Sequence, residues 1–210
     1  MTAERDSAEQ RAEELLGGLR VGASAGSVAA ARGRFAKLAD EKGLVDVAYA
    51  IEDSPYGPLL LAATPRGLVR LGLPNQDPEQ VLSDLAERVS PRVLESPARL
   101  DEARRELDRY FAGELREFDL PLDWQLTHGF RRRVLQATAR IPYGETMSYT
   151  DMAKRAGNER AQRAAGSALG SNPIAIIVPC HRVLRSGGAL GGYGGGLEMK
   201  EALLHLEGSL

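Results

Sequence analysis

Apolar residues in the first half of the chain gather in short runs that turn residues separate. The runs cover residues 44–51, 58–64 and 67–73, with Ser-Pro-Tyr-Gly at 54–57 and Pro-Arg-Gly at 65–67. Short runs bounded by Pro, Gly and Ser are typical of strands joined by tight turns. The pattern therefore predicts an antiparallel meander of three strands.

After these runs, apolar residues recur every three or four positions, which indicates two amphipathic helices. Asp77 and Pro78 supply an N-cap and a first-turn proline for the first of them. The apolar faces consist of Val81, Leu82, Leu85 and Val89 in the first helix and of Leu100, Ala103, Leu107, Tyr110 and Phe111 in the second. Strands followed by helices predict a small α+β domain over residues 44–125.

The rest of the chain, residues 126–210, has mostly helical patterns. An amphipathic helix is predicted over 130–141, with its arginines outward. Its inward positions are Phe130, Val134 and Leu135. The segments 148–157 and 161–172, with a glycine-containing turn between them, then predict a helix-turn-helix. The small side chains of 161–172 suit close approach to a nucleic-acid groove, or equally tight packing on another helix.

Residues 1–43 differ from both parts. They combine a charged, helix-compatible piece, Ala8–Leu19, with the small-residue stretch VGASAGSVAAARGR at 21–34, which has the composition of a linker. We expect residues 1–43 to form a mobile or loosely docked tether. A short leucine stripe within residues 15–19 leaves open that the segment docks on the α+β domain or on a second copy.

Composition is that of an ordinary globular protein, with 43% hydrophobic and 27% charged residues in a chain of 210. The acidic first residues lack the apolar core of a signal peptide, and no stretch approaches the roughly 20 apolar residues that span a bilayer. A single cysteine fits a reducing compartment. We therefore expect a cytoplasmic protein with no membrane contact.

Charge is distributed unevenly behind the formal net charge of −2. Residues 1–125 carry 16 basic and 23 acidic side chains, a net of −7, whereas residues 126–210 carry 11 basic and 6 acidic, a net of +5. A basic part joined to an acidic one indicates that the basic part meets a polyanion such as nucleic acid. The alternative is an ordinary solvated surface.

Cys180, the single cysteine, lies between a proline and His181 in the stretch IAIIVPCHRV. A single thiol forms no internal disulfide, and the scattered histidines at 128, 181 and 205 give no zinc-ligand spacing. A functional Cys180 would therefore be a nucleophile, while the alternative is a small buried hydrophobic residue. A nucleophile needs a base, for which His181 is adjacent, and a carboxylate to orient that base. Glu198, Glu201 and Glu207 are all open as that carboxylate.

Five sequence blocks follow one another around this cysteine: IPYGETMSY, ALGSNP, PCHRV, GGYGGG and KEALLHLEG. In this order they resemble the O6-alkylguanine-DNA alkyltransferase family, strongly over residues 126–210 and more weakly over about 45–125. The resemblance implies an α+β, ribonuclease H-like domain with an antiparallel sheet, followed by a mostly helical, winged helix-turn-helix domain. It also implies direct-reversal DNA repair, in which one alkyl group moves from O6-alkylguanine to the cysteine, with O4-alkylthymine as a further candidate substrate.

The resemblance implies a role for each residue of the site. Cys180 would be the alkyl acceptor, His181 the base that acts through a bound water, and Glu207 the group that orients His181. Asn172 would fix the turn that holds the cysteine, and Tyr149 would donate a proton to the leaving guanine. The substrate base would be surrounded by Tyr149, Val183, Tyr193, Gly194 and Gly195. Some relatives have a hydroxyl or larger side chain where this chain has Gly194.

The same resemblance implies how DNA is bound. Helix 161–172 would lie in the minor groove of double-stranded DNA, and Arg163 would occupy the space of a base flipped out of the duplex. The other DNA contacts would be Ala164, Gly166 and Ser167. No cofactor and no metal is expected, and the protein is expected to act as a monomer.

Two other functions are weighed against this one. A non-enzymatic helix-turn-helix regulator needs long polar side chains to read base edges, and AAGSALG at 164–170 offers almost none. A cysteine hydrolase needs a separately placed histidine and an oxyanion hole, and only His128 and His205 remain for that role.

Overall fold

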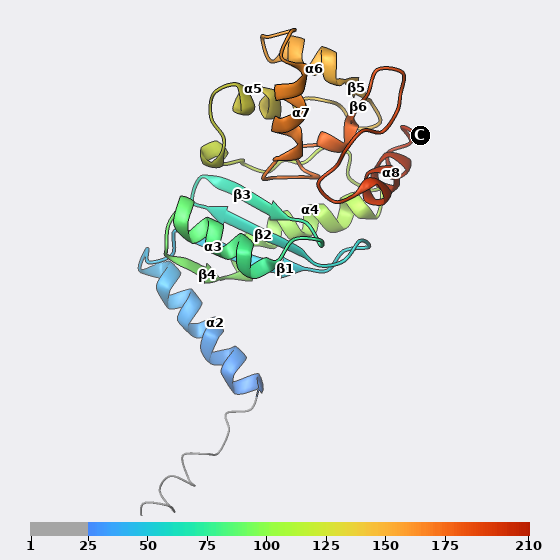
Figure 1. The fold of residues 1–210 in the computed structure, drawn as a ribbon. Helices are drawn as coiled ribbons and strands as arrows, with labels where there is room; N and C mark the ends of the chain where they lie inside the picture. The colour runs from blue at the N-terminus through green and yellow to red at the C-terminus, as the bar shows by residue number, and fades with distance from the viewer. Residues whose placement is uncertain (1–24) are drawn as a thin grey trace, which may run out of the picture. The chain divides into compact units, whose positions relative to one another are not determined.

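A computed structural model of the chain describes residues 25–210 (Figure 1). The described residues fall into two units, the first of which ends at Lys42, while the second is Gly43–Leu210. Within the first unit, Ala25–Glu41 form helix α2.

The prediction of a linker at 21–34 is wrong for the part that α2 contains. Alanine and arginine, which recur in this stretch, are strong helix formers, so small side chains here favour a helix as well as a flexible chain. The predicted helical piece Ala8–Leu19, with its leucine stripe, lies outside the described residues.

The three predicted strands form a sheet in the second unit. They are β1 (Val47–Glu52), β2 (Leu59–Thr64) and β3 (Gly67–Gly72), and each pairs antiparallel with the next. This meander was predicted, and it is confirmed. A fourth strand, β4 (Val93–Glu95), pairs parallel with β1, so the sheet is mixed and has the order β3-β2-β1-β4. The sequence pattern did not predict β4, because three residues are too few to show a period.

Helices α3 (Pro78–Arg88) and α4 (Asp101–Phe111) pack on the sheet as the apolar patterns predicted. The Asp77 side chain caps α3 by accepting a hydrogen bond from the backbone N–H of Glu79 at 3.0 Å. Alternate residues of β2 enter different cores, because successive side chains of a strand point to opposite faces. Leu60 and Ala62 join the core with α3, whereas Leu59 and Leu61 join the larger core with α4.

The C-terminal part, shown from yellow to red in Figure 1, consists mostly of helices and contains the predicted helix-turn-helix. Its elements are α5 (Gly129–Thr138), β5 (Met147–Ser148), α6 (Tyr149–Arg155), α7 (Gln162–Gly170), β6 (Val183–Leu184) and α8 (Leu197–Leu206). The Ser148 side chain caps α6 by accepting from Asp151 N at 3.1 Å, and Gly157 ends this helix with a φ of 85°. Strands β5 and β6 pair in parallel as a small second sheet.

The two parts of the second unit share an interior. The larger core contains Leu61 and Leu107 from the sheet domain together with Val134 and Leu203 from the helical part. Backbone hydrogen bonds also join the parts, from Leu71 N to the carbonyl of Pro173 at 2.7 Å, for example. The predicted boundary near residue 125 therefore does not divide two separate cores, and it stays a prediction.

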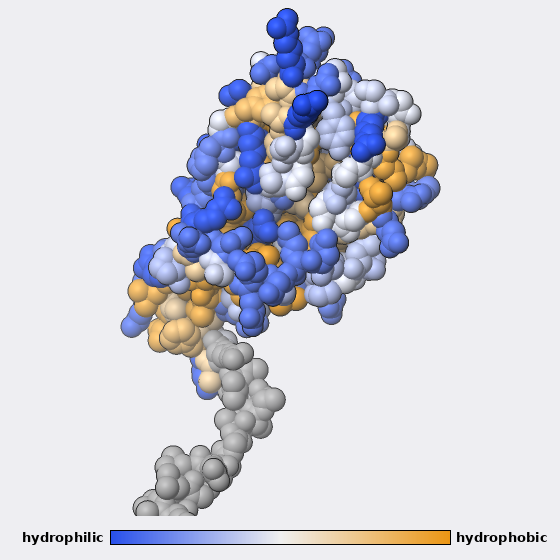
Figure 2. All heavy atoms as spheres, viewed as in Figure 1, coloured by the Kyte–Doolittle hydropathy of each residue, from blue (hydrophilic) through white to orange (hydrophobic). Residues whose placement is uncertain are grey.

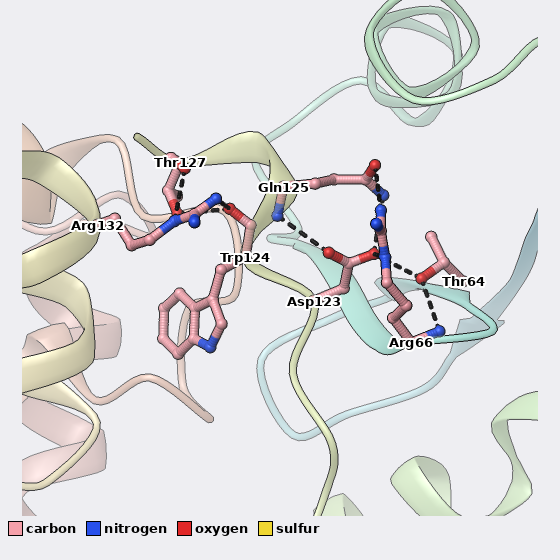
Figure 3. A network of polar contacts seen from close by, with 7 residues as sticks. All are labelled: Thr64, Arg66, Asp123, Trp124, Gln125, Thr127 and Arg132. Atoms are coloured by element: carbon pink, nitrogen blue, oxygen red, sulfur yellow. Dashed lines mark hydrogen bonds and ion pairs between the residues drawn. The ribbon is translucent and has the colours of Figure 1, made fainter. Parts of the chain in front are cut away.

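The connecting segment is held by a polar network (Figure 3). The buried Asp123 accepts hydrogen bonds from Thr64 Oγ1 at 2.6 Å and from Arg66 Nε at 3.1 Å. Arg132 of α5 donates to the carbonyls of Trp124 and Thr127, both at 2.9 Å. These contacts fix the direction in which the chain leaves the sheet and enters α5.

None of the helices within residues 25–210 is long and apolar enough to cross a membrane. Figure 2 shows hydrophilic and apolar residues interspersed over the face that it presents. Leu44, Ile51, Leu197 and Leu210 are the large apolar residues exposed in the second unit. The expectation of no membrane contact stays a prediction.

Candidate active site

The cysteine lies at the end of an apolar segment that enters the core. Residues 174–178 are buried, and a 3-10 turn, Cys180–Arg182, follows them. Ile176 adopts a φ of 72°, which a β-branched residue rarely does, so this segment is held in a strained conformation. Cys180 itself is only 6% exposed. Burial alone would agree with an inert thiol, but the neighbouring side chains are polar.

Asn172, just beyond the C-terminal end of α7, contacts the cysteine directly. Its Nδ2 donates to the carbonyl of Val178 at 2.8 Å and to Cys180 Sγ at 3.2 Å, while its Oδ1 accepts from Ile174 N at 3.0 Å. The side chain therefore closes the turn around the cysteine segment and links it to the end of α7.

His181 and Glu207 form a buried pair. His181 Nε2 lies 3.0 Å from Glu207 Oε1, and both side chains are fully buried. Glu198 and Glu201, the other two candidates, are exposed on α8, which ends just before Glu207. Of the three carboxylates that the sequence left open, Glu207 is therefore the one that contacts His181.

Protonation of this pair follows from its contacts. Burial opposes ionisation of Glu207, but the hydrogen bonds of His181 and Arg182 outweigh it and lower its pKa to about 2. An ionised carboxylate only accepts hydrogen bonds, so His181 Nε2 carries the proton and Nδ1 carries the lone pair. Burial also lowers the pKa of His181, so the ring is a neutral base. Its Nδ1 has no hydrogen-bond partner among residues 25–210.

The thiol needs such a base. Burial raises the pKa of Cys180, and the hydrogen bond from Asn172 and the charge of Lys200 oppose this rise only in part. Lys200 of α8 is itself fully buried, where its Nζ donates to the carbonyls of Val183, at 2.7 Å, and Leu190. Burial lowers the pKa of Lys200 to about 8. At neutral pH the thiol is therefore protonated and becomes a nucleophile only when a base takes its proton.

Tyr149 and the glycine-rich loop lie next to these groups. Burial and the proximity of Cys180 raise the pKa of Tyr149, which therefore stays a proton donor. A Cβ built on Gly191 would meet Tyr149 Oη at 2.9 Å, and one on Gly166 of α7 would meet the same ring at 3.8 Å. Tyr149 is thus placed between α7 and the glycine loop.

Tyr193 and the two glycines after it have different surroundings. The Tyr193 ring stands edge-on to His181, with centroids 6.3 Å apart, and its buried hydroxyl has no partner within the described part of the chain. A Cβ on Gly195 would come 2.5 Å from Met199 Sδ, so any side chain there would force Met199 to move. A Cβ on Gly194 would make only ordinary contact, 3.4 Å from Leu73, and the Gly194 carbonyl accepts from Asn75 Nδ2 at 2.8 Å.

Val183 is engaged within the protein through both of its backbone groups. Its N–H donates to the carbonyl of Cys180, and its carbonyl accepts from Lys200 Nζ. A carbonyl oxygen has two lone pairs, so the second lone pair of this carbonyl is the group that Val183 offers for its predicted place beside the substrate base.

The predicted DNA contacts lie on one face of α7. Arg163, Ala164 and Ser167 are exposed, while Gly166 is half-buried beside Tyr149. The opposite face buries Ala165, Ala168 and Leu169. Small residues therefore allow close helix packing on one side and leave an accessible surface on the other, while the contact with a nucleic-acid groove stays a prediction.

Arg182, Tyr110 and Lys200 belong to the site although the sequence reasoning did not select them. Arg182 donates two hydrogen bonds to the Glu207 carboxylate, from Nε to Oε2 at 2.8 Å and from Nη2 to Oε1 at 2.7 Å. Its position directly after His181 in the sequence could have indicated that Arg182 lies near the site. Tyr110 and Lys200 gave none, since each sits in a helical pattern that only the fold brings to the site.

No group of three His, Cys, Asp or Glu side chains within residues 25–210 could hold a metal ion. The expectation that no metal and no cofactor takes part stays a prediction. The described site therefore consists of a buried cysteine, a neutral histidine and an ionised glutamate, and Asn172 links the cysteine to the end of α7, which has an exposed small-residue face.

Comparison with known proteins gives a separate match for the helical part and for the sheet domain. Residues 129–209 match the DNA-binding domain of 6-O-methylguanine DNA methyltransferase, and residues 47–124 match its ribonuclease-like domain. The chain is 45% identical over 161 residues to a methylated-DNA–protein-cysteine methyltransferase of Methanosarcina acetivorans, covering 77% of this chain and 98% of that protein. It is 46% identical over 161 residues to the Mycobacterium tuberculosis protein of the same name, covering 77% and 92%.

Solved structures give the same result. A Mycobacterium tuberculosis OGT in complex with DNA has a TM-score of 0.66 and 45% identity, covering 77% of this chain and 93% of that one. An O6-methylguanine-DNA methyltransferase from Pyrococcus kodakaraensis has a TM-score of 0.53 and 26% identity, covering 77% and 99%. The chain belongs to the 6-O-methylguanine DNA methyltransferase family. The predicted fold, a ribonuclease-like α+β domain followed by a helical DNA-binding domain, is confirmed.

Proposed function

We propose that this protein repairs alkylated DNA by moving an alkyl group from O6 of guanine to Cys180, where it stays as a thioether. The observation that carries the proposal is the buried hydrogen bond between Glu207 and His181, the residue that directly follows the chain's single cysteine in the sequence. Relatives at 45–46% identity are named methylated-DNA–protein-cysteine methyltransferases, which supports it. A thioether has no good leaving group, so each molecule reacts once.

The thiol proton goes to His181 Nδ1, through one water, as the S–C bond forms. His181 becomes a cation at that moment, and the adjacent Glu207 carboxylate stabilises the new charge. This relay gives a role to the lone pair of His181 Nδ1, the ring nitrogen that does not contact Glu207. Asn172 keeps Sγ in place during the transfer, because its amide binds both Sγ and the turn before it.

The bond from the alkyl carbon to O6 breaks in the same step, and its electron pair stays on the guanine. Tyr149 supplies a proton to that anion, which makes guanine a better leaving group. The loop of Tyr193, Gly194 and Gly195 and the second lone pair of the Val183 carbonyl hold the base. The attacked carbon is an sp³ centre, so the reaction needs no oxyanion hole. O4-alkylthymine is a further candidate substrate.

Double-stranded DNA is the expected partner, with α7 in its minor groove. The damaged base must leave the stack to reach a buried thiol, and Arg163 fills the space that it leaves. Ala164, Gly166 and Ser167 allow the helix to approach the groove closely. The protein is expected to act as a monomer in the cytoplasm, without metal, and its DNA affinity is expected to fall steeply with salt.

Peptide mass spectrometry tests this function. The protein is incubated with a duplex that carries one O6-methylguanine, then digested, and Cys180→Ser serves as the matched control. One added methyl group on the Cys180 peptide, absent from Cys180→Ser, is the expected result. DNA binding without any adduct would support a helix-turn-helix regulator and contradict the proposal.

A further inference from the structure

The ribonuclease-like domain reaches the buried pair through one side chain. Tyr110 of α4 donates a hydrogen bond from its hydroxyl to Glu207 Oε1 at 2.7 Å, across 97 positions of sequence. Tyr110 is 1% exposed, so water does not compete for this bond. The bond is shorter than the 3.0 Å between His181 Nε2 and the same oxygen.

The Tyr110 ring cannot turn freely away from this contact. It stands edge-on to Tyr143, with centroids 6.3 Å apart, and lies tilted against Phe118 at 5.1 Å. Burial and the Glu207 charge raise the pKa of Tyr110, so its hydroxyl keeps the proton that it donates. The donor is therefore fixed in place and permanently available.

The two oxygens of Glu207 are not used equally. Among residues 25–210, Oε1 accepts from His181 Nε2, Arg182 Nη2 and Tyr110 Oη, whereas Oε2 accepts from Arg182 Nε alone. Tyr110 therefore shares with His181 the oxygen that orients the base. It fixes this oxygen in place, and it draws negative charge away from the bond to His181.

We propose that Tyr110 is a positioning residue of the alkyl transfer, through which the ribonuclease-like domain sets the orientation and basicity of the Glu207 and His181 pair. The inference rests on the proposed function. It gives the α+β domain a part in the chemistry in addition to its part in the fold.

The sign of the effect follows from the charges around the pair. Glu207 faces His181 and Arg182 from the cysteine segment, Tyr110 from α4 and Tyr193 from the glycine loop, and Lys200 of α8 adds charge beside His181. Loss of the Tyr110 donor leaves more negative charge on Oε1, which favours protonation of Glu207 and of His181. The reactive form, with ionised Glu207 and neutral His181, is then lost at a higher pH.

The test measures the second-order rate constant for free O6-benzylguanine against pH in the full chain and in Tyr110→Phe. We expect Tyr110→Phe to react about tenfold more slowly at neutral pH, because the carboxylate that orients His181 loses a fixed donor. The added negative charge on Oε1 should move the acidic limb of the profile up by about one pH unit. Tyr143→Phe is the matched control. It removes a hydrogen bond of the same type, from Tyr143 to the carbonyl of Leu206 at 2.8 Å, without touching the carboxylate. The acidic limb of the pH–rate profile of Tyr143→Phe should lie at the same pH as in the wild type.

A second substitution covers the case in which Tyr110→Phe does not fold. Incorporation of 3-fluorotyrosine at position 110 keeps the shape and strengthens the donor, so the acidic limb should move to lower pH. An unmoved limb in the folded variants, or equal effects of Tyr110→Phe and Tyr143→Phe, would overturn the role of Tyr110. An inactive wild type would instead contradict the proposed function, so the two failures are distinguishable.

Discussion

Residues 126–210 and residues 43–125 contribute to the site by different means. Asn172, His181 and Glu207 belong to the first region, and their order along the chain can be read from the sequence blocks around the cysteine. The second region reaches the site by long-range contacts, from Tyr110 to Glu207 and from Asn75 to the Gly194 carbonyl. The reacting groups are thus local to one region, while the other region positions them.

The largest effect is expected from Glu207→Gln. The amide removes the charge that stabilises protonated His181 and leaves Arg182 unpaired in the core, so the rate of alkyl transfer should fall by about 100-fold. Transfer to the protein from free O6-benzylguanine measures it. Glu201→Gln is the matched control, because this exposed glutamate lies on α8, the helix that ends just before Glu207. Equal rates in Glu207→Gln and the wild type would show that the carboxylate has no part in the reaction.

The stability of the protein should depend on the same carboxylate at low pH. The pKa of Glu207 is about 2 in the fold against an ordinary 4.5, so its ionisation stabilises the fold above pH 4.5 and this stabilisation is lost as pH falls toward 2. The contribution at neutral pH is about 3 kcal/mol, of which about 2 kcal/mol is lost by pH 3. Denaturant titrations at pH 7, 4 and 3 check it. The gap in unfolding free energy between wild type and Glu207→Gln should narrow as pH falls, and a constant gap would rule the linkage out.

Arg163→Ala should separate DNA capture from chemistry. We expect repair of a methylated duplex to slow by about tenfold, because the flipped base is held less well, while reaction with free O6-benzylguanine stays close to that of the wild type. Arg160→Ala, also exposed just before α7, is the control for the simple loss of one positive charge. If the free base slowed as much as the duplex, Arg163 would belong to the chemistry and not to base capture.

The smallest effect is expected from removing residues 1–43. The site lies within Gly43–Leu210, which is a compact unit by itself, so residues 44–210 should transfer the alkyl group at nearly the rate of the full chain. Melting temperature and transfer rate are compared between the two forms. A large fall in either would mean that the N-terminal segment is part of the fold or of the site.

The sequence predicted what local patterns determine. Ser148 and Gly157 delimit α6 as expected from capping, and alternation and turns predicted the three antiparallel strands. Local patterns left open which carboxylate meets His181, and only the family resemblance pointed to Glu207. No pattern indicated that Tyr110 joins this pair, because the fold brings Tyr110 there over 97 positions of sequence. Strand β4 was missed because it depends on pairing with β1 and has almost no pattern of its own. The small residues at 25–34 led to the wrong prediction of a linker, because alanine favours a helix as much as a linker.

The most direct test of the central claim is the number of alkyl groups that one protein molecule accepts. A fixed amount of protein is titrated with excess duplex that carries a single radiolabelled O6-methylguanine, and protein-bound label is counted to completion. Because the Cys180 thiol is used up by one transfer, the protein-bound label should reach a plateau at one methyl group per protein molecule. Cys180→Ser should carry no label. Loss of more than one methyl group from the duplex per protein molecule, or full labelling of Cys180→Ser, would contradict the account.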